Sequence, residues 1–212
     1  MTDSYITVSS PSCEEIIINK SRFIGMAKPC SEESEALLFL QSVREEHKTA
    51  THHCYAYIIG DNSGIMRYSD DGEPGGTAGL PIMDTMRTKR IVNCCIVVVR
   101  YFGGVLLGTG GLVRAYTQAA QAALKASGIA RMELTSVEHC EVPYSVWDKI
   151  RYSSEHLPVQ IVHTNYSSAV SFDLLCRTRD KDSVISALME ASDRRLMSEP
   201  LNEMFSPWNI EK

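Results

Sequence analysis

The sequence predicts a soluble two-domain protein of the α+β class. The chain has 212 residues, of which 44% are hydrophobic and 22% charged, so it can bury one large core or two small ones. Runs in which apolar and polar residues alternate are interleaved with segments whose apolar residues recur every three or four positions. All 13 glycines lie between residues 25 and 128, so the composition changes abruptly after Gly128. We therefore expect domains at 1–130 and 131–212.

The first domain is expected to alternate strands and helices. Ser31 is a suitable N-cap for a helix ending near His47, because acidic residues follow in its first turn. Pro81 suits the first turn of a short second helix, and Gly128 suits the end of a long third one. In order, the predicted elements are strands at 15–18 and 23–26, a helix at 31–47, strands at 55–59 and 65–68 joined by a turn at 61–64, a loop at 69–79, a helix at 82–88, a strand at 93–101 and a helix from 112 to Gly128.

The second domain is expected to be a ferredoxin-like sandwich. Its elements follow the order β-α-β-β-α-β, and about 80 residues is a suitable size for that split β-α-β plan. The predicted elements are a strand at 132–142, a helix at 144–156, strands at 159–164 and 169–177, a helix at 181–192 and a strand at 195–204.

The segment 96–124 is the most informative stretch of the chain. A β-branched run ends in Arg100, a glycine-rich loop follows, and an alanine-rich helix opens at Leu112 with Arg114 in its first turn. A strand, a glycine loop and a helix N-terminus together expose backbone N–H groups to an anion. The segment has neither the Gly-Lys-Ser/Thr end of a Walker A loop nor the acidic ribose partner of a dinucleotide fold. Either the loop binds phosphate, or its glycines only allow close packing of strand and helix.

The charge is distributed unevenly along the chain. Residues 1–84, 85–131 and 132–212 carry net charges of −7, +7 and −5, and the middle segment has no acidic residue. This pattern is either a chance cluster spread over several faces or a positive groove for phosphate, nucleotide or RNA backbone.

The cysteines and the N-terminus favour the cytoplasm. The seven cysteines contain no Cys-x-x-Cys pair, and Cys94 and Cys95 are expected to point to opposite faces of one buried strand. No secretory signal or membrane-length apolar run is visible. The histidines show no metal-ligand spacing, so we expect neither a metal nor a cofactor.

Five segments of the first domain closely resemble the IMPACT/YigZ family in order and spacing. They are KSRFI at 20–24, ATH at 50–52 with CYAY at 54–57, SDDGEP at 69–74, GTAG at 76–79, and RYFGGVLLGTGGLVRAY at 100–116. The resemblance implies that the first domain is the left-handed β-α-β two-layer sandwich of ribosomal small-subunit protein five and of elongation factor G domain IV. It implies that the second domain resembles domain V of that factor. This succession favours a ribosome or structured RNA as partner.

The residues and the resemblance together define a candidate anion- or RNA-binding set. The chain has Gly75 where the family usually has serine and His53 where asparagine is common, so His52 is the histidine carried over. Tyr101 and Phe102 either stack on exposed bases, or one of them caps the core where the strand ends. The set comprises Lys20, Arg22, His52, Arg100, Tyr101, Phe102, Gly103, Gly104, Gly108, Gly110, Gly111 and Arg114.

The acidic loop leaves a second function open. Asp70, Asp71 and Glu73 either chelate a magnesium ion that bridges to phosphate, or cap turns and pair with Arg22 or Arg100. A catalytic version would use Asp70 or Asp71 as general base beside His52.

We therefore expect an RNA- or ribosome-associated protein bearing on regulation of translation, with no assigned catalytic residue, no membrane contact and no predicted oligomeric state. The alternative is an enzyme acting on a phosphorylated small molecule or nucleotide, and a third possibility is binding of an acidic protein.

Overall fold

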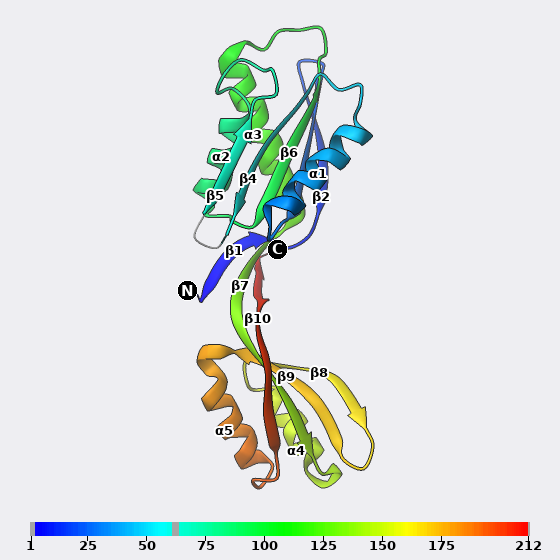
Figure 1. Cartoon of the computed structure of the whole chain (residues 1–212), viewed down its shortest axis with the longest axis vertical. Helices are drawn as coiled ribbons and strands as arrows, with labels where there is room; N and C mark the ends of the chain where they lie inside the picture. The colour runs from blue at the N-terminus through cyan, green and yellow to red at the C-terminus, as the bar shows by residue number, and fades with distance from the viewer. Residues whose placement is uncertain (1–2, 61–63, 212) are drawn as a thin grey trace. The chain divides into compact units, whose positions relative to one another are not determined.

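The structure is a computed structural model that describes residues 3–60 and 64–211 (Figure 1). It confirms the α+β class, with two antiparallel sheets. The turn predicted at 61–64 lies outside the described residues except for Gly64. The elements are β1 (Ser4–Val8), β2 (Ser12–Ile18), β3 (Ser21–Pro29), α1 (Glu33–Glu46), β4 (His52–Ile59), β5 (Ile65–Ser69), α2 (Gly79–Thr88), β6 (Cys94–Tyr101), α3 (Gly108–Ser127), β7 (Ile129–Val142), α4 (Tyr144–Ser154), β8 (Val159–Tyr166), β9 (Val170–Arg177), a 3₁₀ turn (Thr178–Asp180), α5 (Lys181–Ala191) and β10 (Met197–Glu211).

The first sheet has the order β2-β3-β6-β4-β5, so β6 lies at its centre. Strands β3 and β4 are both antiparallel to β6, and α1 therefore connects two parallel strands with β6 between them. Side chains of β6 alternate between two cores: Cys94 packs with one cluster and Cys95 with the other. The predicted opposite orientation of these two cysteines is confirmed. Because both faces are covered, β6 is a continuous apolar run.

Helices cover both faces of this sheet (Figure 1). Ile82 of α2 and Ala119 of α3 belong to the core on one face, whereas Ala36 and Leu40 of α1 belong to the core on the other. The unit thus has a helix layer beyond the two-layer sandwich expected from the sequence. The reason is that α1 has an apolar stripe of its own, which must be buried against a second apolar sheet face.

Helix α3 lies directly on β3. A Cβ atom built on Gly25 would overlap the backbone carbonyl of Ala119 and would come within 3.3 Å of the Ala123 side chain. Glycine in the strand and alanine in the helix therefore set the distance between the two backbones. This contact holds the middle of α3 against the sheet.

The second sheet follows the predicted β-α-β-β-α-β plan. Strands β10, β7, β9 and β8 are neighbours in that order, and β1 also pairs with β7. Helices α4 and α5 pack on one face through Trp147, Ile150 and Leu188 against Phe172 and Leu174 of β9. The sequence did not predict β1, and β10 extends beyond its expected end at residue 204.

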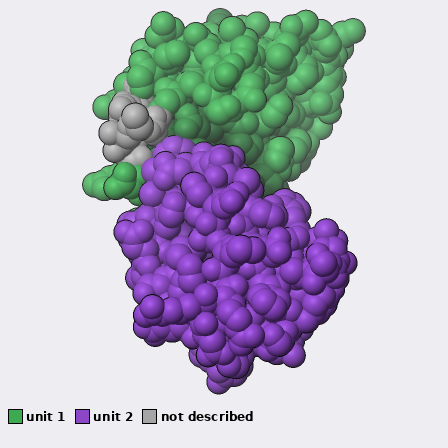
Figure 2. Space-filling view, turned by 60° about the horizontal axis from the view of Figure 1, so that its bottom comes forward, with its two compact units in different colours: residues 1–132, 207–212 green, residues 133–206 purple. Residues whose placement is uncertain are grey.

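The chain forms two compact units, coloured separately in Figure 2. One consists of residues 1–132 and 207–212, and the other of residues 133–206. The sequence places all of 131–212 in the second domain, whereas the end of β10 groups with the first unit because that strand continues past residue 206. No helix in the described ranges is long and apolar enough to cross a membrane.

Two helix starts differ from the expected ones. Helix α1 has Glu32 rather than Ser31 as N-cap, because Glu32 and Glu35 form a capping box. Ser31 instead donates its backbone N–H to Glu35 Oε2 at 2.6 Å. Helix α3 begins at Gly108, four residues before Leu112, so part of the glycine loop is the first helical turn.

Replacing Gly25 by alanine should lower the free energy of unfolding by about 1–3 kcal/mol, because the added methyl group must displace the α3 backbone. Gly75→Ala is the matched control, since a Cβ added there would have no atom within 4 Å and the φ of Gly75 is not left-handed. Urea unfolding of both variants measures the difference. Equal midpoints for Gly25→Ala and the parent chain would contradict this packing.

Candidate functional site

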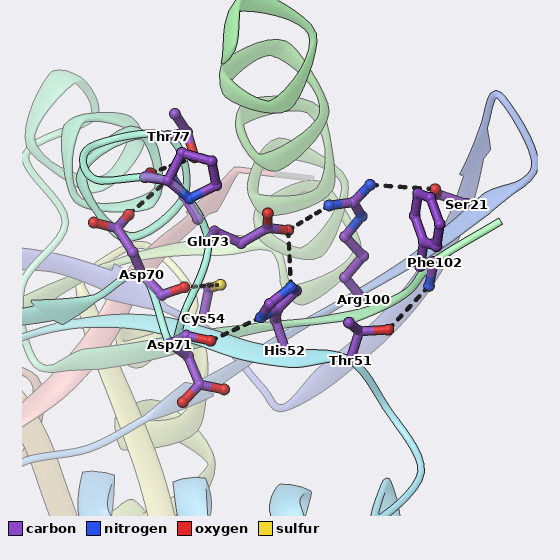
Figure 3. A network of polar contacts seen from close by, with 12 residues as sticks. Ser21, Thr51, His52, Cys54, Asp70, Asp71, Glu73, Thr77, Arg100 and Phe102 are labelled. Carbon is purple, nitrogen blue, oxygen red and sulfur yellow. Dashed lines mark hydrogen bonds and ion pairs between the residues drawn. The ribbon is translucent and has the colours of Figure 1, made fainter. Parts of the chain in front are cut away.

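Of the predicted site residues, His52, Arg100, Phe102 and the acidic loop come together at one end of the first sheet (Figure 3). Strand register produces this arrangement: Arg22 pairs with Tyr101, and His52 pairs with Arg100. The loop between β5 and α2 adds Glu73. Segments far apart in the sequence thus meet because they border the central strand β6.

Arg100 forms a buried ion pair with Glu73. The guanidinium Nη1 donates to Glu73 Oε1 at 2.6 Å, and the two residues are 5% and 8% exposed. The Tyr116 hydroxyl donates to the same oxygen at 2.7 Å. Charge-assisted hydrogen bonds of this kind are short and strong. The expectation that Arg100 contacts an anion at the surface is therefore corrected, because its charge is neutralised inside the protein.

The interior of this network is not poised for nucleophilic chemistry. Burial raises the pKa of the Cys54 thiol to about 12, and its Sγ donates to the backbone oxygen of Asp70 at 3.0 Å. Burial, together with the neighbouring Cys54 and Glu73, raises the pKa of the Tyr116 hydroxyl well above its usual range. A protonated buried thiol is an inert core residue.

His52 also belongs to the internal network. Its Nδ1 lies 2.8 Å from the backbone oxygen of Asp71, and a carbonyl only accepts hydrogen bonds, so Nδ1 carries the proton. Its Nε2 lies 3.9 Å from Glu73 Oε1, and the side chain is only 18% exposed. The ring contacts the acidic loop through Nδ1, whereas Nε2 makes no hydrogen bond within the described residues, so the role of His52 in anion binding stays a prediction.

The carboxylate of Asp70 stabilises the start of α2. Its Oδ1 accepts the backbone N–H groups of Ala78 and Gly79 at 3.0 and 2.8 Å, and its Oδ2 accepts that of Gly76 at 2.9 Å. Such N–H groups near a helix start have no partner within the helix. Asp70 is thus a helix cap supplied from a preceding loop.

Asp71 is likewise engaged. Its Oδ2 accepts the backbone N–H of His53 at 2.6 Å, and its Oδ1 lies 3.6 Å from Arg44. With Asp70 and Glu73, all three acidic-loop carboxylates therefore form caps or ion pairs. Across residues 3–60 and 64–211, no group of three histidine, cysteine or acidic side chains is arranged to hold a metal. None of these three carboxylates is therefore free to bind magnesium or to act as a general base.

The five loop glycines have different roles. A Cβ on Gly103 would overlap the backbone of Lys20 and Ser21, and Gly104 and Gly108 have φ values of +82° and +66°. These three are required by the backbone. Gly110 and Gly111 have no left-handed φ, and the atom nearest to a Cβ on Gly110 is Nη1 of Arg114 at 3.9 Å.

The first turn of α3 is an exposed positive end. Its N-cap Leu107 gives no side-chain cap, and no acidic residue lies in the turn. The guanidinium of Arg114 folds back beside Gly110, and in the described part of the chain it has no ion-pair partner. Leu106, just before the turn, is 86% exposed. Helix dipole and side-chain charge therefore add at one open surface.

The remaining predicted residues lie at the β2–β3 turn, at the start of β3 and at the end of β6. Lys20 is exposed in a left-handed turn, and Arg22 is exposed but pairs with Glu15 at 2.7 Å. Tyr101 is half-buried and packs against the core, whereas Phe102 is 47% exposed. The two rings lie toward opposite faces of the sheet, as strand alternation requires.

Sequence reasoning did not identify Tyr116 or Thr51 as parts of the site. Tyr116 is fully buried and holds Glu73, and Thr51 Oγ1 accepts the backbone N–H of Phe102 at 3.1 Å. The sequence feature that could have identified Tyr116 is its place on the apolar face of an otherwise alanine-rich helix. Thr51 lies in one of the family-like segments but has no signal of its own.

Comparison with known proteins gives consistent matches over both units. Residues 19–124 match the family "Impact N-terminal domain", and residues 140–193 match a domain of unknown function, DUF1949. The chain is 36% identical over 193 residues to "IMPACT family member YvyE" of Bacillus subtilis, covering 91% of this chain and 89% of that protein. It is 43% identical over 125 residues to "IMPACT family member YigZ" of Escherichia coli, covering 58% and 61%.

A crystal structure described as that of a hypothetical protein superposes with a TM-score of 0.61 at 31% identity. The match covers 95% of this chain and 99% of the other one. The likeness thus extends over both units of the chain.

Arg100→Met should lower the free energy of unfolding by about 3–5 kcal/mol, because it leaves the Glu73 carboxylate buried without its cation. Glu73→Gln should also be strongly destabilising, and the double variant should lose less than the sum of the two. Urea unfolding of the four proteins in a double-mutant cycle measures the coupling. Additive losses would show that the two side chains do not depend on each other.

The loop glycines should separate into two groups when each is replaced by alanine. Gly103→Ala should lower the free energy of unfolding by about 1–3 kcal/mol through overlap with the β2–β3 turn. Gly110→Ala should be neutral or raise it by up to about 1 kcal/mol, because alanine is the better helix residue and has room. Thermal melts distinguish the two. Strong destabilisation by Gly110→Ala would make the whole loop structural.

Proposed function

The chain belongs to the IMPACT family, and on that premise we propose that it is a cytoplasmic protein that binds RNA, within or associated with the ribosome, and bears on regulation of translation. The observation that carries this proposal is the first turn of α3, which is exposed, uncapped by any described side chain and flanked by the guanidinium of Arg114. We infer that an RNA phosphate group binds at this turn.

A helix start without a cap is incomplete in two respects. Its first backbone N–H groups lack intrahelical acceptors, and the helix carries a partial charge of about +0.5 at that end. Arg114 adds a full positive charge where the helix dipole disfavours one. A bound phosphate would accept the N–H groups and neutralise both charges. Gly110, which leaves open space over the turn, allows that group to approach closely.

Two further cations lie at the same end of the first unit. The backbone of Gly103 touches that of Lys20, so the β2–β3 turn and the β6–α3 loop are adjacent. Lys20 is exposed on that turn, and Arg22 is exposed just after it, in β3. Together with Arg114 they provide three cations that can follow a phosphate backbone, although Arg22 must share its charge with Glu15.

The positive surface is smaller than the charge of segment 85–131 suggests. Of its seven cations, Arg100 is neutralised by Glu73, and Arg87 lies 3.7 Å from Asp84. Binding must therefore depend on a few well-placed contacts and not on a broad basic face. Translation as the setting follows from the resemblance of both domains to those of a ribosomal protein and a translocation factor, which is an argument by analogy of fold.

RNA affinity should fall with salt in proportion to these few contacts. Three phosphate contacts on a single strand predict roughly a twentyfold loss between about 50 and 200 mM salt. Arg114→Gln should weaken binding and reduce the salt slope by about 0.7, whereas Arg67→Gln, an exposed arginine on β5, should change neither. Fluorescence anisotropy with labelled RNA measures both quantities. Absence of binding at about 50 mM salt, or binding independent of salt, would reject the proposal.

A further inference from the structure

We propose that the RNA bound at this site is single-stranded and that one unstacked base lies on the ring of Phe102. The inference rests on the RNA-binding function proposed above and names its substrate class. The observation that carries it is that this exposed ring, unlike an ordinary surface side chain, is fixed by contacts of its backbone and of one of its faces.

The backbone of Phe102 is fixed on both sides. Its own N–H donates to Thr51 Oγ1 at 3.1 Å (Figure 3), and the N–H of Gly103 donates to Ser21 Oγ at 3.2 Å. Gly103 is also packed against the backbone of the β2–β3 turn. The ring therefore has little freedom to move away with the loop that follows it.

The ring lies within cation–π range of a buried guanidinium, which also lies near a buried aromatic ring. Phe23 is fully buried, the Arg100 guanidinium lies 5.4 Å from its ring centre, and the same guanidinium lies 5.5 Å from the ring centre of Phe102. Guanidinium groups are planar and stack on aromatic rings. The bond from Arg100 to Glu73 holds the guanidinium in place. Arg100 and Glu73 are thus positioning residues for an exposed aromatic surface.

The exposed side of the Phe102 ring fits a nucleobase. Phe102 is 47% exposed although one of its faces is covered by Arg100, so the accessible area lies on the side away from the core. Every base has a flat π surface, and proteins bind single strands by stacking bases on such rings next to phosphate contacts. The cationic turn of α3, which the same loop joins to Phe102, provides the phosphate contact. Bases inside an A-form duplex are already stacked and unavailable.

The experiment compares a short labelled single strand with its duplex in the full chain at about 50 mM salt. Phe102→Leu removes the π surface but keeps an apolar side chain, and Phe102→Tyr keeps the ring. Tyr68→Leu is the matched control, because Tyr68 is 50% exposed on β5 in the same unit. A 2-aminopurine base in the single strand reports stacking through quenching of its fluorescence.

The parent chain and Phe102→Tyr should bind the single strand more tightly than the duplex and quench 2-aminopurine. Phe102→Leu should lose about 5- to 150-fold in single-strand affinity and lose the quenching, while its duplex affinity and thermal melt stay unchanged. Tyr68→Leu should behave as the parent. Equal binding of single strand and duplex with no effect of Phe102→Leu would overturn this inference and leave the proposed function standing. No binding of either RNA would reject the proposed function itself.

Discussion

The structure of the first unit depends on one buried ion pair, between Arg100 and Glu73. Burying two charges is costly unless their hydrogen-bonding groups are satisfied. Here Glu73 Oε1 accepts from both Arg100 and Tyr116, while Arg100 Nε has no hydrogen-bond partner within the described residues. The pair is therefore a poor source of net stability compared with an apolar core. The ion pair instead fixes the positions of the groups around it.

The ion pair brings together segments that are remote in the sequence. Arg100 lies near the end of the central strand β6, Glu73 lies in the loop before α2, and Tyr116 is in α3. Phe23 of β3 packs under the guanidinium, and His52 of β4 lies beside the carboxylate. These residues come from the same segments by which the chain resembles its family. The motifs thus describe one physical unit, in which an internal network positions an exposed aromatic ring a few residues before an exposed helix start.

The parts of this unit that follow from local chemistry could be predicted, and those that follow from tertiary pairing could not. The apolar run of β6 and the alanine-rich stripe of α3 each indicate their own structure. The sequence places the start of α3 at Leu112 because glycine is a poor helix residue, yet three glycines open the helix. Pairing of the acidic loop with Arg100 is one of the alternatives that the sequence offers, and it is confirmed, but a count of charges alone does not show that Glu73, 27 residues away, is the residue that neutralises Arg100. The end of β10 is not predicted because it contains Pro207, and proline is unfavourable in most strands. Prolines do occur on edge strands.

Net charge is a weak guide to what an acidic protein of this kind binds. The chain carries −5 overall, and a distant polyanion is therefore repelled, but beyond about 10 Å this repulsion is screened at ordinary ionic strength. At contact, the field at the first turn of α3 depends on the nearest groups, which are the helix dipole and Arg114. The internal pairing of Arg100 sharpens this contrast. It removes one cation from the surface and places it beside Phe102. In the proposed function, recognition therefore depends on the placement of one ring and one helix end more than on the number of charges.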